Sequence, residues 1–108
     1  MHLLLNRLIL GACFALGCNL AYAAVNPAEV LAQKSGCLAC HGISQKILGP
    51  SYKDVAAKYK GDKSAESKLI TKVKAGGSGA WGNMPMPANS PQVKDDDIKT
   101  IVQWILSL

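Results

Sequence analysis

The sequence of 108 residues contains few aromatic side chains: they make up 6% of it and include a single phenylalanine. This scarcity excludes a core built on aromatic bulk. The sequence also shows no repeats, no strand-like alternation and no basic cluster interleaved with aromatics, so nucleic-acid binding has little support. It offers no nucleophile arrangement and no general acid–base pair, which argues against an enzyme. With 49% hydrophobic and 18% charged residues, it has the composition of one globular domain.

The apolar residues are concentrated at the N-terminus. Arg7 precedes an unbroken apolar and small run over residues 8–17, and a cleavage site of the small-x-small type ends at Ala23. This order is typical of a secretory signal peptide, and the apolar run is short for a membrane-spanning helix. We therefore predict a signal peptide over residues 1–23 and one domain over residues 24–108.

Removal of the leader would change which residues are available for chemistry. Cys13 and Cys18 would leave with it, and His41 would become the sole histidine, which excludes a bis-histidine metal site within one chain. The remaining chain would hold eleven lysines and seven acidic residues, a net charge of +4. An uncleaved N-terminal anchor and lipid attachment at Cys18 stay open as alternatives. A domain this small needs a stabilising cross-link or bound group in addition to its apolar core.

Caps, helix breakers and apolar spacing predict four helices, over residues 26–36, 51–59, 64–74 and 95–107. Asn26 and Ser64 are the expected caps of the first and third helices. The third helix has a predicted buried stripe of Leu69, Ile70 and Val73.

The last helix has the most regular apolar stripe. Its members recur at helical spacing and are Ile98, Ile101, Val102, Ile105 and Leu106, with Trp104 at the edge as a core residue. Three aspartates over residues 95–97 are expected to cap this helix and complement its dipole.

Residues 76–94 carry four glycines and three prolines without periodicity, so we predict a long loop there. Trp81 and two methionines within it favour a loop that wraps around something.

The chemistry-bearing motif is Cys37-Leu38-Ala39-Cys40-His41. Cys-x-x-Cys-His is the attachment signature of c-type haem: both thiols can add to haem vinyl groups, and the histidine is delivered to the iron. A thioredoxin-type disulfide would need a βαβ setting, and a zinc site would need a fourth ligand.

The second axial position of the iron has several candidates in the sequence: Met84, Met86, a lysine or no ligand. A proline-stiffened loop bearing soft sulfur ligands favours a methionine. Met86 lies between Pro85 and Pro87, which restrict the backbone on both sides.

These motifs together resemble the class I cytochromes c, in particular the small bacterial periplasmic group of the c-551/c-552 type. The resemblance covers nearly all of residues 24–108. The stretches that carry it are Pro27–Leu31, Gly36–His41, Gly49–Tyr59, Gly79–Gly82, Pro85–Asn89 and the helix containing Trp104.

The resemblance implies an all-α fold, with helices wrapped around one covalently attached haem c per chain. Cys37 and Cys40 would form the thioethers, and His41 and Met86 would be the axial ligands of the iron. The carbonyl of Pro50 would accept a hydrogen bond from the other ring nitrogen of His41.

The resemblance also implies three supporting roles. Trp81 would reach a haem propionate, Asn89 would bond near the methionine sulfur, and Gly36 would let the first and last helices cross closely. Ala88 and Ala32 depart from the family pattern, and the packing at Ala32 is therefore open.

The function implied by the resemblance is that of a monomeric periplasmic electron carrier between respiratory complexes and terminal reductases or oxidases. Its partners would be redox proteins such as a cytochrome bc1-type complex, nitrite reductase, cytochrome oxidase or peroxidase, without stable membrane insertion after cleavage. Two alternatives stay open: a haem peroxidase or detached oxidase subunit, and a gas-binding module.

Overall fold

The structure is a computed structural model that describes residues 23–108. The signal peptide predicted over residues 1–23 therefore lies outside the described residues, apart from Ala23. Residues 23–108 fold into four helices, one 3-10 turn and two short strands. In order these are α1 (Pro27–Lys34), the 3-10 turn (Cys37–Ala39), α2 (Tyr52–Lys58), α3 (Ala65–Ala75), β1 (Gly77–Gly79), β2 (Gly82–Met86) and α4 (Asp95–Leu106). Within residues 23–108, no helix is long and apolar enough to cross a membrane.

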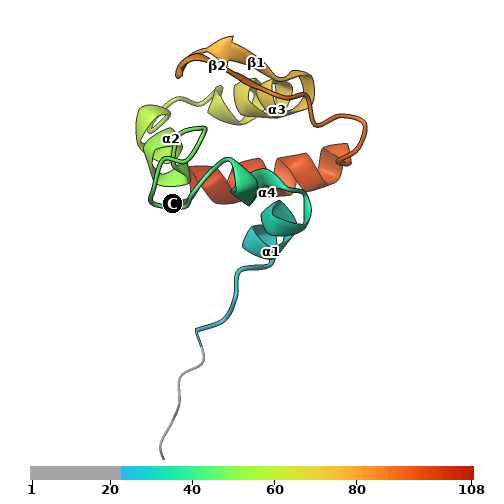
Figure 1. Ribbon diagram of the computed structural model, residues 1–108. Coiled ribbons are helices and arrows are strands. Elements are labelled where there is room, and N and C mark those ends of the chain that lie inside the picture. The colour runs from blue at the N-terminus through green and yellow to red at the C-terminus, as the bar shows by residue number, and fades with distance from the viewer. Residues whose placement is uncertain (1–22) are drawn as a thin grey trace, which may run out of the picture.

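Helix α4 is the centre of the arrangement and contacts each of the other three helices. In Figure 1 it runs between α1 on one side and α3 on the other, with the two strands beyond α3. Side chains from α1, α2 and α4 form the main apolar core: Ala28, Ala32, Tyr52, Val55, Ile101, Trp104 and Ile105. The predicted stripe of α4 is confirmed, since four of its five members are buried and Leu106 is half-buried.

The two buried residues of α1 are both alanines. Ala32 is fully buried and Ala28 is 8% exposed, so small side chains let α1 approach the core. The role expected for Gly36 in this crossing was wrong, because a Cβ built there would meet no atom within 4 Å. Gly36 instead has a left-handed backbone with φ of 81°, which glycine adopts without steric cost where the 3-10 turn begins.

Of the caps predicted for the first and third helices, one is confirmed and one is not. Asn26 caps α1 as expected, and its Oδ1 accepts from the Ala28 N–H at 2.9 Å. Ser64 stands at the start of α3, but its hydroxyl makes no capping bond and donates to Asp62 Oδ1 instead. The backbone of Ser64, with φ of −95° and ψ of 0°, also lacks the extended conformation that is typical of a capping residue.

The cap of α4 is Lys94, and its side chain makes no capping bond. The expectation that the aspartates cap this helix was therefore wrong. All three lie within its first turn, where negative charge complements the positive end of the helix dipole. Asp95 also forms an ion pair with Lys74 at 2.8 Å, which ties the start of α4 to the last turn of α3.

The expectation of a long loop over the whole of residues 76–94 was wrong in part, because this segment contains two short strands. Strands β1 and β2 pair antiparallel, with Gly77 opposite Met86 and Gly79 opposite Gly82. The sequence conceals this hairpin because β1 is Gly-Ser-Gly and has almost no side chains to alternate. Its three paired glycines have positive φ values, which further separates the segment from an ordinary strand.

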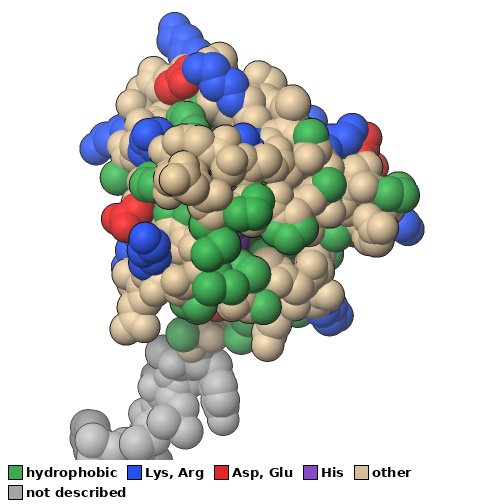
Figure 2. Space-filling view, turned by 45° about the horizontal axis from the view of Figure 1, so that its top comes forward, with side chains coloured by type: hydrophobic (Ala, Val, Ile, Leu, Met, Phe, Trp, Pro, Cys, Tyr) green, Lys and Arg blue, Asp and Glu red, His purple; other side chains and the backbone are tan. Residues whose placement is uncertain are grey.

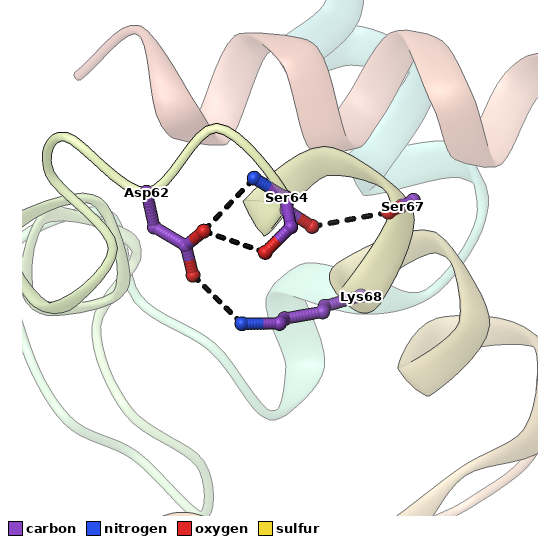
Figure 3. A network of polar contacts seen from close by, with 4 residues as sticks. All are labelled: Asp62, Ser64, Ser67 and Lys68. Carbon is purple, nitrogen blue, oxygen red and sulfur yellow. Dashed lines mark hydrogen bonds and ion pairs between the residues drawn. The ribbon is translucent and has the colours of Figure 1, made fainter.

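The turn before α3 is held by a small polar network, drawn in Figure 3. Asp62 accepts from the Ser64 hydroxyl at 2.6 Å, from the Ser64 N–H at 2.8 Å and from Lys68 Nζ at 2.9 Å. These bonds favour the carboxylate form and lower the pKa of Asp62 from 3.8 to about 2, with the Ser64 hydroxyl as the largest cause.

We predict that Ser64→Ala raises the pKa of Asp62 toward its ordinary value, as measured by an NMR titration of the carboxyl carbon. The folded pKa lies below the unfolded one, so this group stabilises the fold fully above pH 3.8 and loses that effect as pH falls through about 2. Ser67→Ala is the matched control, because the Ser67 hydroxyl bonds only to the Ser64 carbonyl in this network. An unchanged Asp62 titration in Ser64→Ala would contradict the assignment.

Candidate functional site

A cavity of about 380 Å³ opens between α2, α3, the hairpin and α4. Figure 2 shows hydrophobic side chains gathered around a hollow on one face, with the purple of a histidine visible between them. Most residues singled out from the sequence line this cavity, namely Cys37, Cys40, His41, Pro50, Trp81, Met84 and Met86. Asn89 is not part of the lining.

The cysteines and the histidine occupy one tight turn of the chain. The N–H groups of Cys40 and His41 both donate to the Cys37 carbonyl, at 3.2 and 3.1 Å, which closes the turn. Both thiols are free and half-buried. Burial raises the pKa of the Cys37 thiol above its ordinary value, so this thiol is protonated at neutral pH.

The His41 ring is held by its contacts with the segment that follows it. Its Nδ1 lies 2.7 Å from the carbonyl oxygen of Pro50. Because a carbonyl can only accept, Nδ1 carries a proton, and in the neutral ring Nε2 is the nitrogen that has the lone pair for a metal. Ring orientation and tautomer are therefore set by the chain itself, as is usual for histidines that bind metals.

Gly49 and Tyr52 also touch the His41 ring, and sequence reasoning assigned neither a role at the site. A Cβ built on Gly49 would lie 2.6 Å from His41 Cε1 and 2.9 Å from Nδ1, so only glycine leaves room for the ring. Tyr52 stacks on the ring with centroids 5.1 Å apart and an interplanar angle of 17°. The contact of His41 with the Pro50 carbonyl was expected from the resemblance, but the steric role of the neighbouring Gly49 was not foreseen.

Tyr52 links this site to the core. It meets Trp104 edge to face, with centroids 5.6 Å apart. Burial raises the pKa of Tyr52 far above its ordinary value, so its hydroxyl stays neutral. The aromatic contact continues from His41 through Tyr52 to α4, which makes the position of the histidine part of the core packing.

Met84 and Met86 both line the cavity, but they differ in exposure. Met84 is 61% exposed, whereas Met86 is half-buried at the end of β2, opposite Gly77 in the hairpin. A Cβ built on Gly76 would lie 2.5 Å from the Met86 carbonyl oxygen, so the chain passes close to α3 only because this residue is glycine. The hairpin register therefore fixes the backbone at Met86.

Asn89 ties the segment after Met86 to the end of α3. Its side-chain Nδ2 donates to the carbonyls of Val73, at 3.3 Å, and Pro87, at 3.1 Å, and its backbone N–H donates to Val73 at 3.1 Å. The described bonds anchor the methionine segment, and the predicted bond near the sulfur stays a prediction.

The remaining walls of the cavity are largely apolar. The predicted stripe of α3 is only half-buried, and two of its members, Leu69 and Val73, line the cavity. Trp81 lies at the turn between the strands, 42% exposed, and also lines the cavity. A concave apolar site with two free thiols and an oriented histidine in one turn fits a covalently attached haem.

Comparisons with known proteins agree with this assignment. A family model described as Cytochrome c matches residues 25–108. Cytochrome c-551 of Allochromatium vinosum is 58% identical over 79 residues, which cover 73% of this chain and 83% of that protein. Cytochrome c-551 of Pseudomonas aeruginosa is 49% identical over 79 residues, or 73% of this chain and 74% of that protein.

The fold is shared with a solved structure as well. Wild-type cytochrome c552 of Nitrosomonas europaea superimposes with a TM-score of 0.70 at 46% identity, covering 74% of this chain and 98% of that one. The predicted helical fold of a class I cytochrome c is thus confirmed, with a small hairpin added. We conclude that the chain belongs to the cytochrome c family and that its haem c is attached covalently, with Cys37 and Cys40 fitting the attachment motif.

Proposed function

We propose that the protein is a periplasmic electron carrier that transfers single electrons through its haem, with His41 and Met86 as the two axial ligands of the iron. The observation that carries this proposal is that His41 and Met86, 45 residues apart in the sequence, line the same cavity. The haem, when bound, supplies an iron that cycles between Fe(III) and Fe(II).

The chain's own residues suit this role because they are held in place. Pro50 and Gly49 restrict the orientation of His41, and the hairpin register restricts the backbone at Met86. Ligands that keep their positions in both oxidation states favour fast electron transfer over chemistry at a vacant site. A nitrogen and a thioether sulfur together also favour a raised potential.

The predicted leader bears on the location of the protein, and the lysines at the cavity mouth bear on its partners. The leader over residues 1–23 would direct the chain to the periplasm, where a cytochrome bc1-type complex, nitrite reductase, cytochrome oxidase or peroxidase would exchange electrons with it. Lys46 and Lys72 line the cavity, and Lys58 lies over Trp81 at its edge. These three cations would attract acidic partner surfaces to the mouth.

We predict that Met86→Leu abolishes the weak near-infrared band of methionine–iron bonding in the oxidised protein and lowers its reduction potential. Leucine keeps the volume of methionine but removes the sulfur ligand. The measurements are absorption spectra in both redox states, voltammetry and carbon monoxide binding to the reduced protein. Carbon monoxide should bind Met86→Leu without denaturant and leave the wild type untouched.

Met84→Leu is the matched control for this test, since Met84 is a methionine of the same strand that is 61% exposed. It should keep the band, the potential and the resistance to carbon monoxide. Loss of the band in Met84→Leu instead would show that the wrong methionine has been assigned. Carbon monoxide binding by the wild-type protein would favour a gas-binding module or a peroxidase over a carrier.

We predict that Gly49→Ala destabilises the protein by about 1–3 kcal/mol, the typical cost of overpacking, and shifts the NMR resonances of His41. The added methyl group would clash with the His41 ring. Gly61→Ala is the control, because Gly61 has open space around it and a left-handed φ of 81°. It should lose about 1–2 kcal/mol through backbone strain without moving the His41 resonances. Equal His41 shifts in both variants would contradict this account.

We predict that electron transfer to an acidic acceptor slows on the order of tenfold as salt screens the lysines at the mouth, measured by stopped-flow across ionic strength. Lys72→Met should flatten this salt dependence, because Lys72 lines the cavity. Lys99→Met removes the same charge from an exposed position on α4 outside the lining and should leave the profile near that of the wild type. A flat wild-type profile would favour apolar docking instead.

A further inference from the structure

A contact between Lys58 and Trp81 lies at the mouth of the cavity and involves neither of the proposed axial ligands. The Nζ of Lys58 lies over the Trp81 ring, 4.9 Å from its centroid. Lys58 is the last residue of α2, whereas Trp81 lies at the turn between β1 and β2. Helix α2 and the hairpin form different walls of the cavity, so this contact joins two walls that are 23 positions apart in the sequence.

Lys58 is available for this contact because it has no acidic partner. The two ion pairs within residues 23–108 are Lys68–Asp62 and Lys74–Asp95, and neither involves Lys58. As the basic residue of the last turn of α2, it also lies where a positive charge is favourable to the helix dipole. An ammonium group over an indole ring is attracted to the negative face of the aromatic system.

The geometry leaves the polar edge of the indole unused. A cation above the ring takes the aromatic face, whereas the indole N–H lies in the plane of the ring and points outward. No hydrogen bond from the Trp81 indole occurs among residues 23–108, so this donor is free for a partner from outside the chain. Trp81 is 42% exposed, so the polypeptide gives it less packing support than it gives Trp104, which is 7% exposed.

We propose that Lys58 is a positioning residue for the haem edge. The cation–π contact of its ammonium group holds the hairpin against α2 and fixes the orientation of the Trp81 indole ring. The indole N–H is thereby directed to an anionic group of the cofactor. This inference rests on the proposed function, because the anionic group belongs to the haem. Lys58 acts through Trp81 and need not touch the cofactor.

The test compares three variants of the haem-loaded protein. Lys58→Met keeps most of the side-chain length but removes the charge, and Lys58→Arg keeps a cation that can stack on an aromatic face. Lys53→Met is the matched control, because Lys53 is an exposed lysine of the same helix and its loss changes the net charge equally. The first readout is the indole N–H signal of Trp81 in the reduced protein, with Trp104 as the internal reference and Trp81→Phe for assignment.

In Lys58→Met, the Trp81 indole proton should shift and exchange with solvent about two- to fivefold faster, which is the loss expected for one exposed cation–π contact. The Trp104 signal should not move. Lys58→Arg should restore the wild-type signal, and Lys53→Met should resemble the wild type. A Trp81 signal that is the same in Lys58→Met and Lys53→Met would overturn the inference.

The reduction potential gives a second, independent readout. Removal of either lysine should lower the potential, because a positive charge near the iron favours Fe(II), but Lys58→Met should lower it further than Lys53→Met. In the Trp81→Phe background, which lacks the indole N–H, that additional shift should disappear. If the additional shift persists there, Lys58 acts through its charge alone and the inference is wrong. The proposed function is tested separately, by reversible redox cycling of the wild type and of Lys53→Met.

Discussion

The fold depends on a cavity that the polypeptide does not fill by itself. Side chains of α1, α2 and α4 make a small core, but the apolar face of α3 is only half-buried and turns Leu69 and Val73 toward the cavity. A domain of this size has little apolar surface to bury, so a covalently attached haem supplies the contact surface that the side chains lack. The scarcity of aromatic residues has the same cause, since the cofactor takes the place of aromatic bulk.

The histidine side of this cavity is built into the rest of the core. His41 is restrained by the Pro50 carbonyl and by the absence of a side chain at Gly49, and it stacks on Tyr52. Tyr52 in turn meets Trp104 of α4. Because interiors transmit small displacements between packed groups, the orientation of the ring is set by the same packing that stabilises the helices. A change in the packing of Tyr52 or Trp104 would therefore also change the orientation of His41.

The methionine side is built differently, from backbone geometry. The hairpin places Met86 opposite Gly77, and Gly76 lets the chain pass against the end of α3. Asn89 bonds the segment back to the Val73 carbonyl. Few side chains are buried in this segment, so glycines and hydrogen bonds take over the role that apolar packing has on the histidine side. The contact between Lys58 and Trp81 adds the one described aromatic link from α2 to the hairpin.

The sequence by itself determined the helices and the site chemistry, because both depend on local patterns. The spacing of Ile98, Ile101 and Ile105 identifies the face of α4, and the order of Cys37, Cys40 and His41 identifies the haem attachment motif. The axial roles of His41 and Met86 stay predictions that the cavity supports.

Only the tertiary structure decided the features that depend on residues distant in sequence. The pairing of β1 with β2 cannot be predicted from alternating side chains, because β1 has almost none. Glycine is needed at position 36 because of its left-handed backbone angle and not because two helices cross there. The steric role of Gly49 and the contact of Lys58 with Trp81 arise only when separate segments meet. Such contacts leave no periodic signal in a single chain, because periodicity reports which face of an element is buried and not what lies against it.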